Sequence, residues 1–231
     1  MKILAMDTSS VNATVALSDN NRIMGEYTVS NDRAHSQIIM PMLDELLRHC
    51  SAEIKEVDVF AVALGPGSFT GLRIGIAAMK TLAQALNKPI IGISSLDAVA
   101  ASFFATDKII CPIFDARRND VYNAVYFGDK KLVADRIVDF DELLIEMSEK
   151  DVIFAGDAVL KYADKIKSFD KPNWHIAPGS LLMQRASTLA AIAYDRALNG
   201  DYDNLFEVSP IYIRLPQAER EYNLAHGIAI N

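Results

Sequence analysis

The first third of the chain consists of short segments whose apolar and polar positions predict strands. Residues 3–7 are an apolar run that ends in a polar turn, and residues 12–18 alternate between apolar and polar side chains. Asp19-Asn20-Asn21 has the composition of a hairpin turn and leads into a further strand at residues 22–29. We therefore expect these three strands to form an antiparallel meander.

Helical periodicity then appears twice in the first half. Apolar residues recur at helical spacing over residues 34–50 and 71–86, and a continuous apolar run between them at residues 57–64 predicts a buried strand. Pro41 lies within the first of these segments, where it predicts an early kink or marks the first helical turn. The remaining elements expected in this half are a strand at residues 89–93 and a helix at residues 94–104.

The second half repeats this order of elements. Its expected elements are strands at residues 108–115, 121–127, 132–138, 152–155 and 174–176, and helices at residues 140–147, 158–167 and 181–198. Asp7 and Asp115 end the first strand of each half. Solenoid repeats span about 20–50 residues. The separation between Asp7 and Asp115 is longer than this, so it indicates a duplicated domain. Two βββαβαβα halves, residues 1–104 and 105–231, predict an α/β protein with two ribonuclease H-like lobes, as in the actin/Hsp70/sugar-kinase fold.

The charge of the chain limits the partners it could bind alone. The formal net charge is −7, which argues against a stand-alone nucleic-acid-binding protein, because phosphate contacts need clustered Lys and Arg. The local basic pairs are Arg117-Arg118 and Lys130-Lys131, and we interpret both as solvated loops. Any role in RNA chemistry would therefore depend on a more basic partner.

The apolar runs and the cysteines indicate a cytoplasmic protein. The longest apolar runs are short and interrupted, so we expect no membrane-spanning segment, and the N-terminus lacks the apolar run of a secretory signal. Cys50 and Cys111 are the two cysteines, and neither lies in a ligand-spaced cluster. Neither a disulfide framework nor a zinc site is indicated.

A glycine-rich loop, GPGSFTG at residues 65–71, leads from a predicted strand into a predicted helix. Glycines allow close backbone approach and a helix start favours an anion, so the loop could hold a phosphate. It has neither the G-K-[ST] ending of a Walker A loop nor the third glycine of G-x-G-x-x-G. A tight turn whose glycines serve packing fits equally well. The candidate phosphate-binding residues are Gly65, Gly67, Ser68, Thr70 and Gly71.

Few side chains have a context that predicts catalysis. In kinases of this fold a carboxylate at the position of Asp7 helps to hold Mg²⁺, but we interpret Asp7 as a cap on its own turn. We interpret His35 as a partly exposed residue at a helix start. The histidines lack metal-ligand spacing, and no serine or cysteine has a G-x-S-x-G context. We therefore predict no catalytic residue and no metal site, and we discount a peptidase.

The two helices predicted in the first half carry broad apolar faces, and the second is rich in small residues that let helices approach closely. These faces could pack only against their own sheet, or could also meet another subunit. The candidate interface residues are His35, Ile39, Met42, Leu43, Leu46, Gly71, Ile74, Gly75, Ala78 and Met79.

Several motifs together resemble the TsaB (YeaZ) family. They are ILAMDTSSVNATVAL at residues 3–17, HSQIIMPML at 35–43, LGPGSFTGLRIG at 64–75 and NKPIIGISS at 87–95, with weaker matches at 114–117 and 214–216. This resemblance implies a fold like that of TsaD, the enzyme that modifies adenosine 37 of ANN-decoding tRNAs. TsaD-like enzymes hold a metal through H-x-x-x-H, whereas the matching positions here are Ser95 and Val99. Neither side chain can replace an imidazole ligand.

The resemblance therefore implies a non-catalytic partner of TsaD that pairs through helices of the first lobe, in a platform that the ATPase TsaE joins. It also implies that ATP and metal bind the partner subunits, that tRNA is bound only through the complex, and that the same face forms a homodimer without TsaD. The alternative is a small-molecule kinase or ATPase of the same fold. That alternative is disfavoured because the second-half loop at residues 115–119 contains no glycine.

Overall fold

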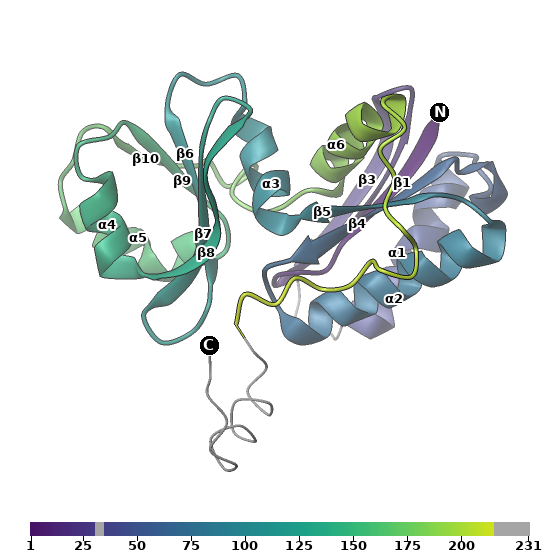
Figure 1. Cartoon of the computed structure of the whole chain (residues 1–231), viewed down its shortest axis with the longest axis horizontal. Coiled ribbons are helices and arrows are strands. Elements are labelled where there is room, and N and C mark those ends of the chain that lie inside the picture. Colours follow the sequence, from purple (N-terminus) through teal and green to yellow (C-terminus); the bar gives the residue numbers. More distant parts are fainter. Residues whose placement is uncertain (31–34, 215–231) are drawn as a thin grey trace, which may run out of the picture.

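The computed structural model describes residues 1–30 and 35–214, which build two lobes (Figure 1). The first half of the chain contains β1 (Lys2–Asp7), β2 (Asn12–Asp19), β3 (Arg22–Ser30), α1 (His35–His49), β4 (Val59–Gly65), α2 (Phe69–Leu86), β5 (Ile90–Ser94) and α3 (Ser95–Ala100). The second half contains β6 (Ile109–Asp115), β7 (Asp120–Phe127), β8 (Lys130–Asp139), α4 (Phe140–Met147), β9 (Val152–Ala155), α5 (Ala158–Ser168), β10 (Trp174–Ile176) and α6 (Ala186–Leu198).

Each half forms one five-stranded sheet, and both sheets have the same topology. The strand orders are β3-β2-β1-β4-β5 and β8-β7-β6-β9-β10. In each sheet the first three strands are antiparallel and the following strands pair in parallel. The predicted fold class of two βββαβαβα halves is therefore confirmed.

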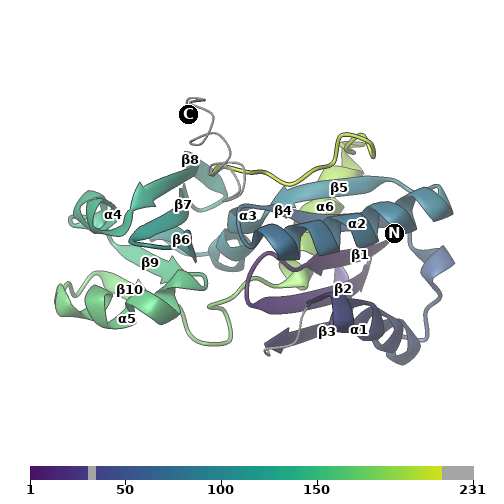
Figure 2. The ribbon, with the colours of Figure 1, turned by 90° about the horizontal axis from the view of Figure 1, so that it is seen from below.

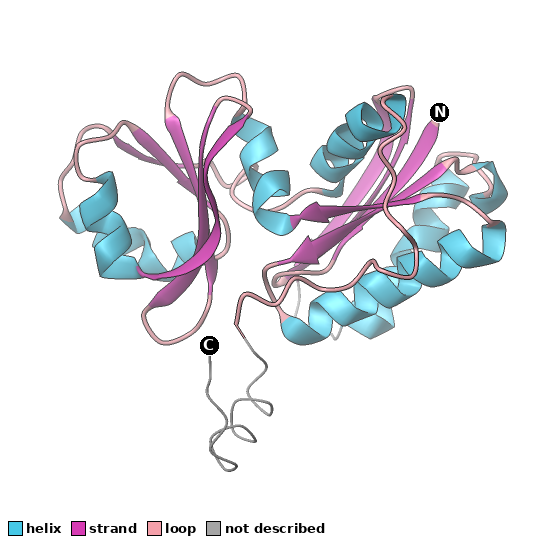
Figure 3. Cartoon of the chain, viewed as in Figure 1, coloured by secondary structure: helices cyan, strands magenta, loops and turns pink. Residues whose placement is uncertain are grey.

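Helices cover both faces of the first sheet (Figures 2 and 3). Helices α1 and α2 lie on its outer face, where their apolar side chains join a core with Leu4, Val15 and Phe60. The other face carries a second core, to which α6 contributes Leu189 and a row of alanines. Because alanine side chains are short, α6 can lie close to the strands.

The third helix of each half packs on the sheet of the other half. Helix α3 directs Leu96 and Val99 into the core of the second sheet, and α6 from the second half packs on β1, β2, β4 and β5 of the first. Figure 1 shows both helices between the sheets. A boundary at residue 105 separates the two sheets. It does not separate two independently packed units, because α3 packs on the second sheet and α6 packs on the first.

The helix predicted at residues 181–198 begins five residues too early, and this prediction is wrong. Helix α6 starts at Ala186. Before it, the amide of Gln184 donates to the Ser10 hydroxyl, and Arg185 forms an ion pair with Glu26 on β3. The apolar residues of this segment favour a helix, but the polar residues Gln184 and Arg185 beside them attach the chain to the first lobe.

Smaller boundary differences have local causes. Helix α2 begins at Phe69 rather than at Gly71, because the hydroxyl of Ser68 caps it by accepting the N–H of Gly71 at 3.2 Å. Helix α1 continues through Pro41, which is therefore not in its first turn. The segment predicted as helix at 94–104 is α3 followed by a 3₁₀ turn at Ala101–Phe103, and residue 34 lies outside the described residues.

After α6 the chain runs back along the first lobe as a strap, residues 201–214. The N–H of Asp203 donates to the carbonyl of Ile90, and the ammonium of Lys80 donates to the carbonyl of Val208. The N–H of Ile211 then donates to the carbonyl of Leu64. The described helices include none that is long and apolar enough to cross a membrane.

Candidate functional site at the junction of the lobes

Two loops meet at the edge of the first sheet that faces the second lobe. The loop after β1 contains Thr8 and Ser9, and the loop after β4 leads into α2. The N–H of Ser68 donates to the carbonyl of Ser9 at 2.6 Å, and the hydroxyl of Thr8 donates to the carbonyl of Gly71 at 2.7 Å. The two loops are therefore joined directly to each other.

The glycines of the second loop are required for this contact. A Cβ atom at Gly71 would lie 2.0 Å from the carbonyl oxygen of Thr8, and one at Gly67 would lie 2.2 Å from that of Ser9. A Cβ at Gly75 would lie 2.4 Å from the hydroxyl oxygen of Thr8. Only residues without a side chain fit between the loop and the helix.

This geometry favours the packing interpretation of residues 65–71 over a phosphate site. The N–H groups of Ser68 and Gly71 already have protein acceptors. The carbonyl oxygens of Thr8 and Ser9 lie against the start of α2 and would repel a phosphate there. Gly65, at φ +104°, shapes the turn, and Thr70 points to solvent.

Asp7 is fully buried at the end of β1. One carboxylate oxygen accepts the N–H of Ser9 at 2.7 Å, which confirms that Asp7 caps its own turn. The other oxygen has no hydrogen-bond partner among the described residues. Burial raises the pKa of Asp7 to about 6, partly offset by its bonds to Ser9 and by nearby His35.

The second lobe brings a half-buried carboxylate to this junction. Asp157 follows β9, and one of its oxygens accepts the N–H of Asp115 at 2.8 Å. Burial, and then the proximity of Asp115 and Asp7, raise the pKa of Asp157 to about 6. Sequence reasoning missed Asp157, although Gly156-Asp157 follows the fourth strand of its half and Gly65 ends the fourth strand of the first.

His35 and Gln184 both contact Ser10 in the loop after β1. A ring nitrogen of His35 lies 2.8 Å from the carbonyl oxygen of Ser10, so His35 is attached to the loop after β1 and half-buried. Gln184 is fully buried and bonds the same residue through its amide. Sequence reasoning also missed Gln184, because it was assigned to a helix.

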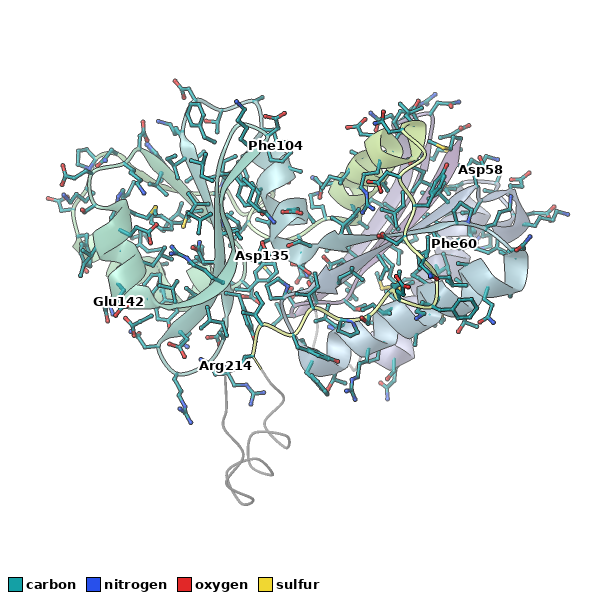
Figure 4. The ribbon with its side chains drawn as sticks, in the orientation of Figure 1. Asp58, Phe60, Phe104, Asp135, Glu142 and Arg214 are labelled. Atoms are coloured by element: carbon teal, nitrogen blue, oxygen red, sulfur yellow. The ribbon has the colours of Figure 1, made fainter. Side chains whose placement is uncertain are left out.

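Polar bonds also join the lobes beside α3. The hydroxyl of Ser94 donates to Asp135 on β8 at 2.6 Å, and Lys131 pairs with both Asp135 and Asp97. Figure 4 labels Asp135 and Arg214, which lie where the lobes meet. Both lobes are therefore held by contacts on more than one side of the junction.

The two positions that the family resemblance matches to metal ligands are core positions here. Ser95 and Val99 are both 0% exposed, and Val99 packs in the core of the second sheet. These side chains do not fit a transition metal, because neither offers an imidazole or a carboxylate. The part of the chain that the structure describes contains no cluster of three His, Cys, Asp or Glu side chains suited to a metal ion.

Most of the predicted interface residues face the core of their own lobe. The buried ones are Ile39, Met42, Leu43, Leu46, Gly71, Gly75 and Met79, and the half-buried ones are His35, Ile74 and Ala78. The apolar periodicity thus marked the face that α1 and α2 turn to the sheet. Their exposed faces are largely polar, and among the polar side chains they carry Met40 (44% exposed) and Pro41 on α1, and Ala77 and Ala85 on α2.

Comparison with known proteins identifies close relatives. The family model of TsaD, tRNA N6-adenosine threonylcarbamoyltransferase, matches residues 22–222. The tRNA threonylcarbamoyladenosine biosynthesis protein TsaB of Bacillus subtilis is 32% identical, over 96% of this chain and 98% of its own. The structure of YeaZ from Pseudomonas aeruginosa superposes with a TM-score of 0.77 at 25% identity, over 91% of this chain and 99% of its own. Another structure from that organism, described as an uncharacterized protein with similarity to peptidase YEAZ, gives 0.78 at 25% identity over 92% and 99%.

The packing of α2 against the loop after β1 can be tested with Gly71→Ala. The added methyl group would overlap the carbonyl oxygen of Thr8, so we expect a loss of more than about 2 kcal/mol in the free energy of unfolding measured in urea. Gly179→Ala is the matched control, because a Cβ atom there meets nothing within 4 Å. Equal stability of the two variants would refute the packing interpretation.

Asp7→Asn should change how stability depends on pH. The folded chain holds the Asp7 proton more tightly than the unfolded chain, so ionisation opposes folding as the pH rises from about 4 to about 6. Above pH 7 we expect the variant to be more stable than the wild type, by at most about 3 kcal/mol in urea unfolding, with little difference at pH 4. A stability difference that does not vary with pH would contradict the assignment.

Proposed function

The chain belongs to the TsaD-like family of tRNA threonylcarbamoyladenosine proteins, among its TsaB members, and from this we propose that it is a non-catalytic partner of TsaD in that modification of ANN-decoding tRNAs. One observation carries the proposal. The chain has the fold of the family, but Ser95 and Val99 fill the positions of the metal ligands with buried side chains. ATP and metal are then supplied on the partner subunits, in the cytoplasm.

The loops at the lobe junction support a non-catalytic role. In a kinase of this fold, loops from both lobes would approach the phosphates of a nucleotide. Here the loop after β1 lies on the start of α2, and backbone carbonyl oxygens take the place where phosphate oxygens would need N–H donors. The corresponding loop of the second lobe carries Arg117 and Arg118 and no glycine. Neither loop supports the alternative of a small-molecule kinase or ATPase.

The exposed faces of α1 and α2 are suited to a helical partner. The two helices contact each other on the outer side of the first lobe (Figure 2). Small and apolar side chains on this surface, among them Met40, Ala77 and half-buried Ala78, allow close approach of further helices. We place the TsaD contact here, with TsaE joining the assembled pair and a second copy of the chain using the same face when TsaD is absent.

Charges on the exposed faces of α1 and α2 should abolish pairing without unfolding the chain. We expect Met40→Glu and Ala77→Glu to prevent co-purification with TsaD, because each would place an unpaired charge in a packed interface. Leu160→Glu is the control, since Leu160 is 65% exposed on α5 of the other lobe. If both first-lobe variants pair at full strength while circular dichroism shows them folded, the interface is misplaced.

The purified chain alone should not hydrolyse ATP or phosphorylate a sugar at rates typical of enzymes, about 1 per second or faster. The measurement is release of phosphate or formation of ADP by the chain without partners. A rate in that range, lost on substitution of a junction residue such as Asp7, would favour the kinase or ATPase alternative.

A further inference from the structure

Four arginines in the described part of the chain form no ion pair, and three of them are associated with the lobe junction. The four are Arg22, Arg73, Arg117 and Arg118. Arg117 and Arg118 are exposed on the loop between β6 and β7, and Arg73 is exposed on the second turn of α2. Arg117 and Arg118 thus place two adjacent unpaired positive charges on one loop of a chain whose net charge is −7.

The carboxylates that flank Arg117 and Arg118 in the sequence are engaged with other cations. Asp115 pairs with Lys161 at 2.9 Å, and Asp120 pairs with Arg214 of the strap. Within the described residues the two guanidinium groups therefore keep their full charge and their hydrogen-bond donors. A planar guanidinium with free donors is suited to bidentate contact with phosphate.

The loop is held in a backbone conformation that arginine rarely adopts. Arg117 has φ +67° and Arg118 has φ +57°, in the left-handed region that Asn and Gly occupy at lower cost. Asn20 and Asn21 fill the equivalent conformations in the hairpin between β2 and β3. Asparagine at positions 117 and 118 would therefore reduce the backbone strain. That arginine is present instead indicates that its side chains have a role other than forming the turn.

Surrounding residues fix this loop in place. The carbonyl of Arg118 accepts from the ammonium of Lys161 at 3.0 Å and from the hydroxyl of Tyr162 at 3.3 Å. The carbonyl of Ala116 accepts from Arg214 at 2.7 Å. The backbone is therefore anchored from α5 on one side and from the strap on the other, and both guanidinium groups are left exposed.

The strap brings an aromatic surface toward the same loop. Two residues before Arg214, the ring of Tyr212 stacks on that of Phe69 with centroids 4.9 Å apart. The guanidinium of Arg73 lies 3.9 Å from the Phe69 centroid and donates to the Tyr212 hydroxyl at 2.9 Å. Cations beside partly exposed aromatic rings are a combination found where proteins contact RNA.

We propose that Arg117 and Arg118 contact the phosphate backbone of the tRNA in the assembled complex, with Arg73 and Tyr212 beside them; this rests on the proposed function. The arginines lie on an exposed loop, which suits an extended polyanion better than a small nucleotide that needs an enclosing pocket. The acidic remainder of the chain repels a polyanion, so contact is confined to this place.

The test is a double variant, Arg117→Asn/Arg118→Asn, in the complex with TsaD. Asparagine tolerates the left-handed conformation, so the loop should keep its shape while two charges are lost. The matched control is Arg22→Asn/Lys130→Asn, which loses the same charge from unpaired, exposed hairpin positions. Those hairpins follow β2 and β7, and each lies at the end of its sheet opposite to the end that carries Asp7 or Asp115.

The readout is the affinity of each complex for an in vitro transcribed ANN-decoding tRNA as a function of salt. Each lost phosphate contact lowers the slope of log affinity against log salt by about 0.7 to 0.9, so we expect a slope smaller by about 1.5 and an affinity about tenfold weaker at 50 mM salt. The control should match the wild type.

Three results would overturn the proposal. If the variant pairs with TsaD but binds tRNA with unchanged affinity and slope, the arginines do not contact RNA, and the proposed function stands. If the variant instead fails to recruit TsaE while tRNA binding is unchanged, the arginines belong to a protein contact. If the wild-type chain does not pair with TsaD at all, the proposed function and this inference both fail.

Discussion

The exchange of α3 and α6 between the two lobes is the constraint on which the rest of the molecule depends. Val99 on α3 belongs to the core of the second sheet, and Leu189 on α6 belongs to a core of the first. Burial of apolar area is the main force available to a domain of this size, so neither lobe can complete its core without a helix from the other half. The lobes are consequently built as one unit, and the junction between them is set by core packing.

This constraint also determines which contacts hold the junction between the lobes. Kinases of this fold close two lobes around a ligand by a hinge motion. Here Gln184, Arg185 and Arg214 each join parts that are far apart in the sequence, and the loop after β1 is packed on α2 through Gly71. Buried Asp7 remains at the end of β1 with one unpaired oxygen, at a cost to stability when it ionises.

The sequence predicted the strands and the topology well, because alternation and buried apolar runs depend on local spacing. It could not predict where α6 packs, since a row of alanines such as Ala190 and Ala193 fits any closely approached surface. It also assigned Met42 and Met79 to a partner, because the apolar face of a helix looks the same whether it meets its own sheet or another subunit. Asp157 was missed because a single Gly-Asp pair after a strand carries no motif.

The exposed faces of α1 and α2 and the loop of Arg117 and Arg118 occupy different parts of the molecule, and both are positioned by buried structure. Because the strap runs from β5 past α2 to the second lobe, Tyr212 and Arg214 link the first surface to the second. A partner bound on the helices and a polyanion bound at the loop would therefore be held at a set distance. Under the proposed function, the chain would supply a defined geometry between its ligands, and the reacting groups would come from the partner subunits.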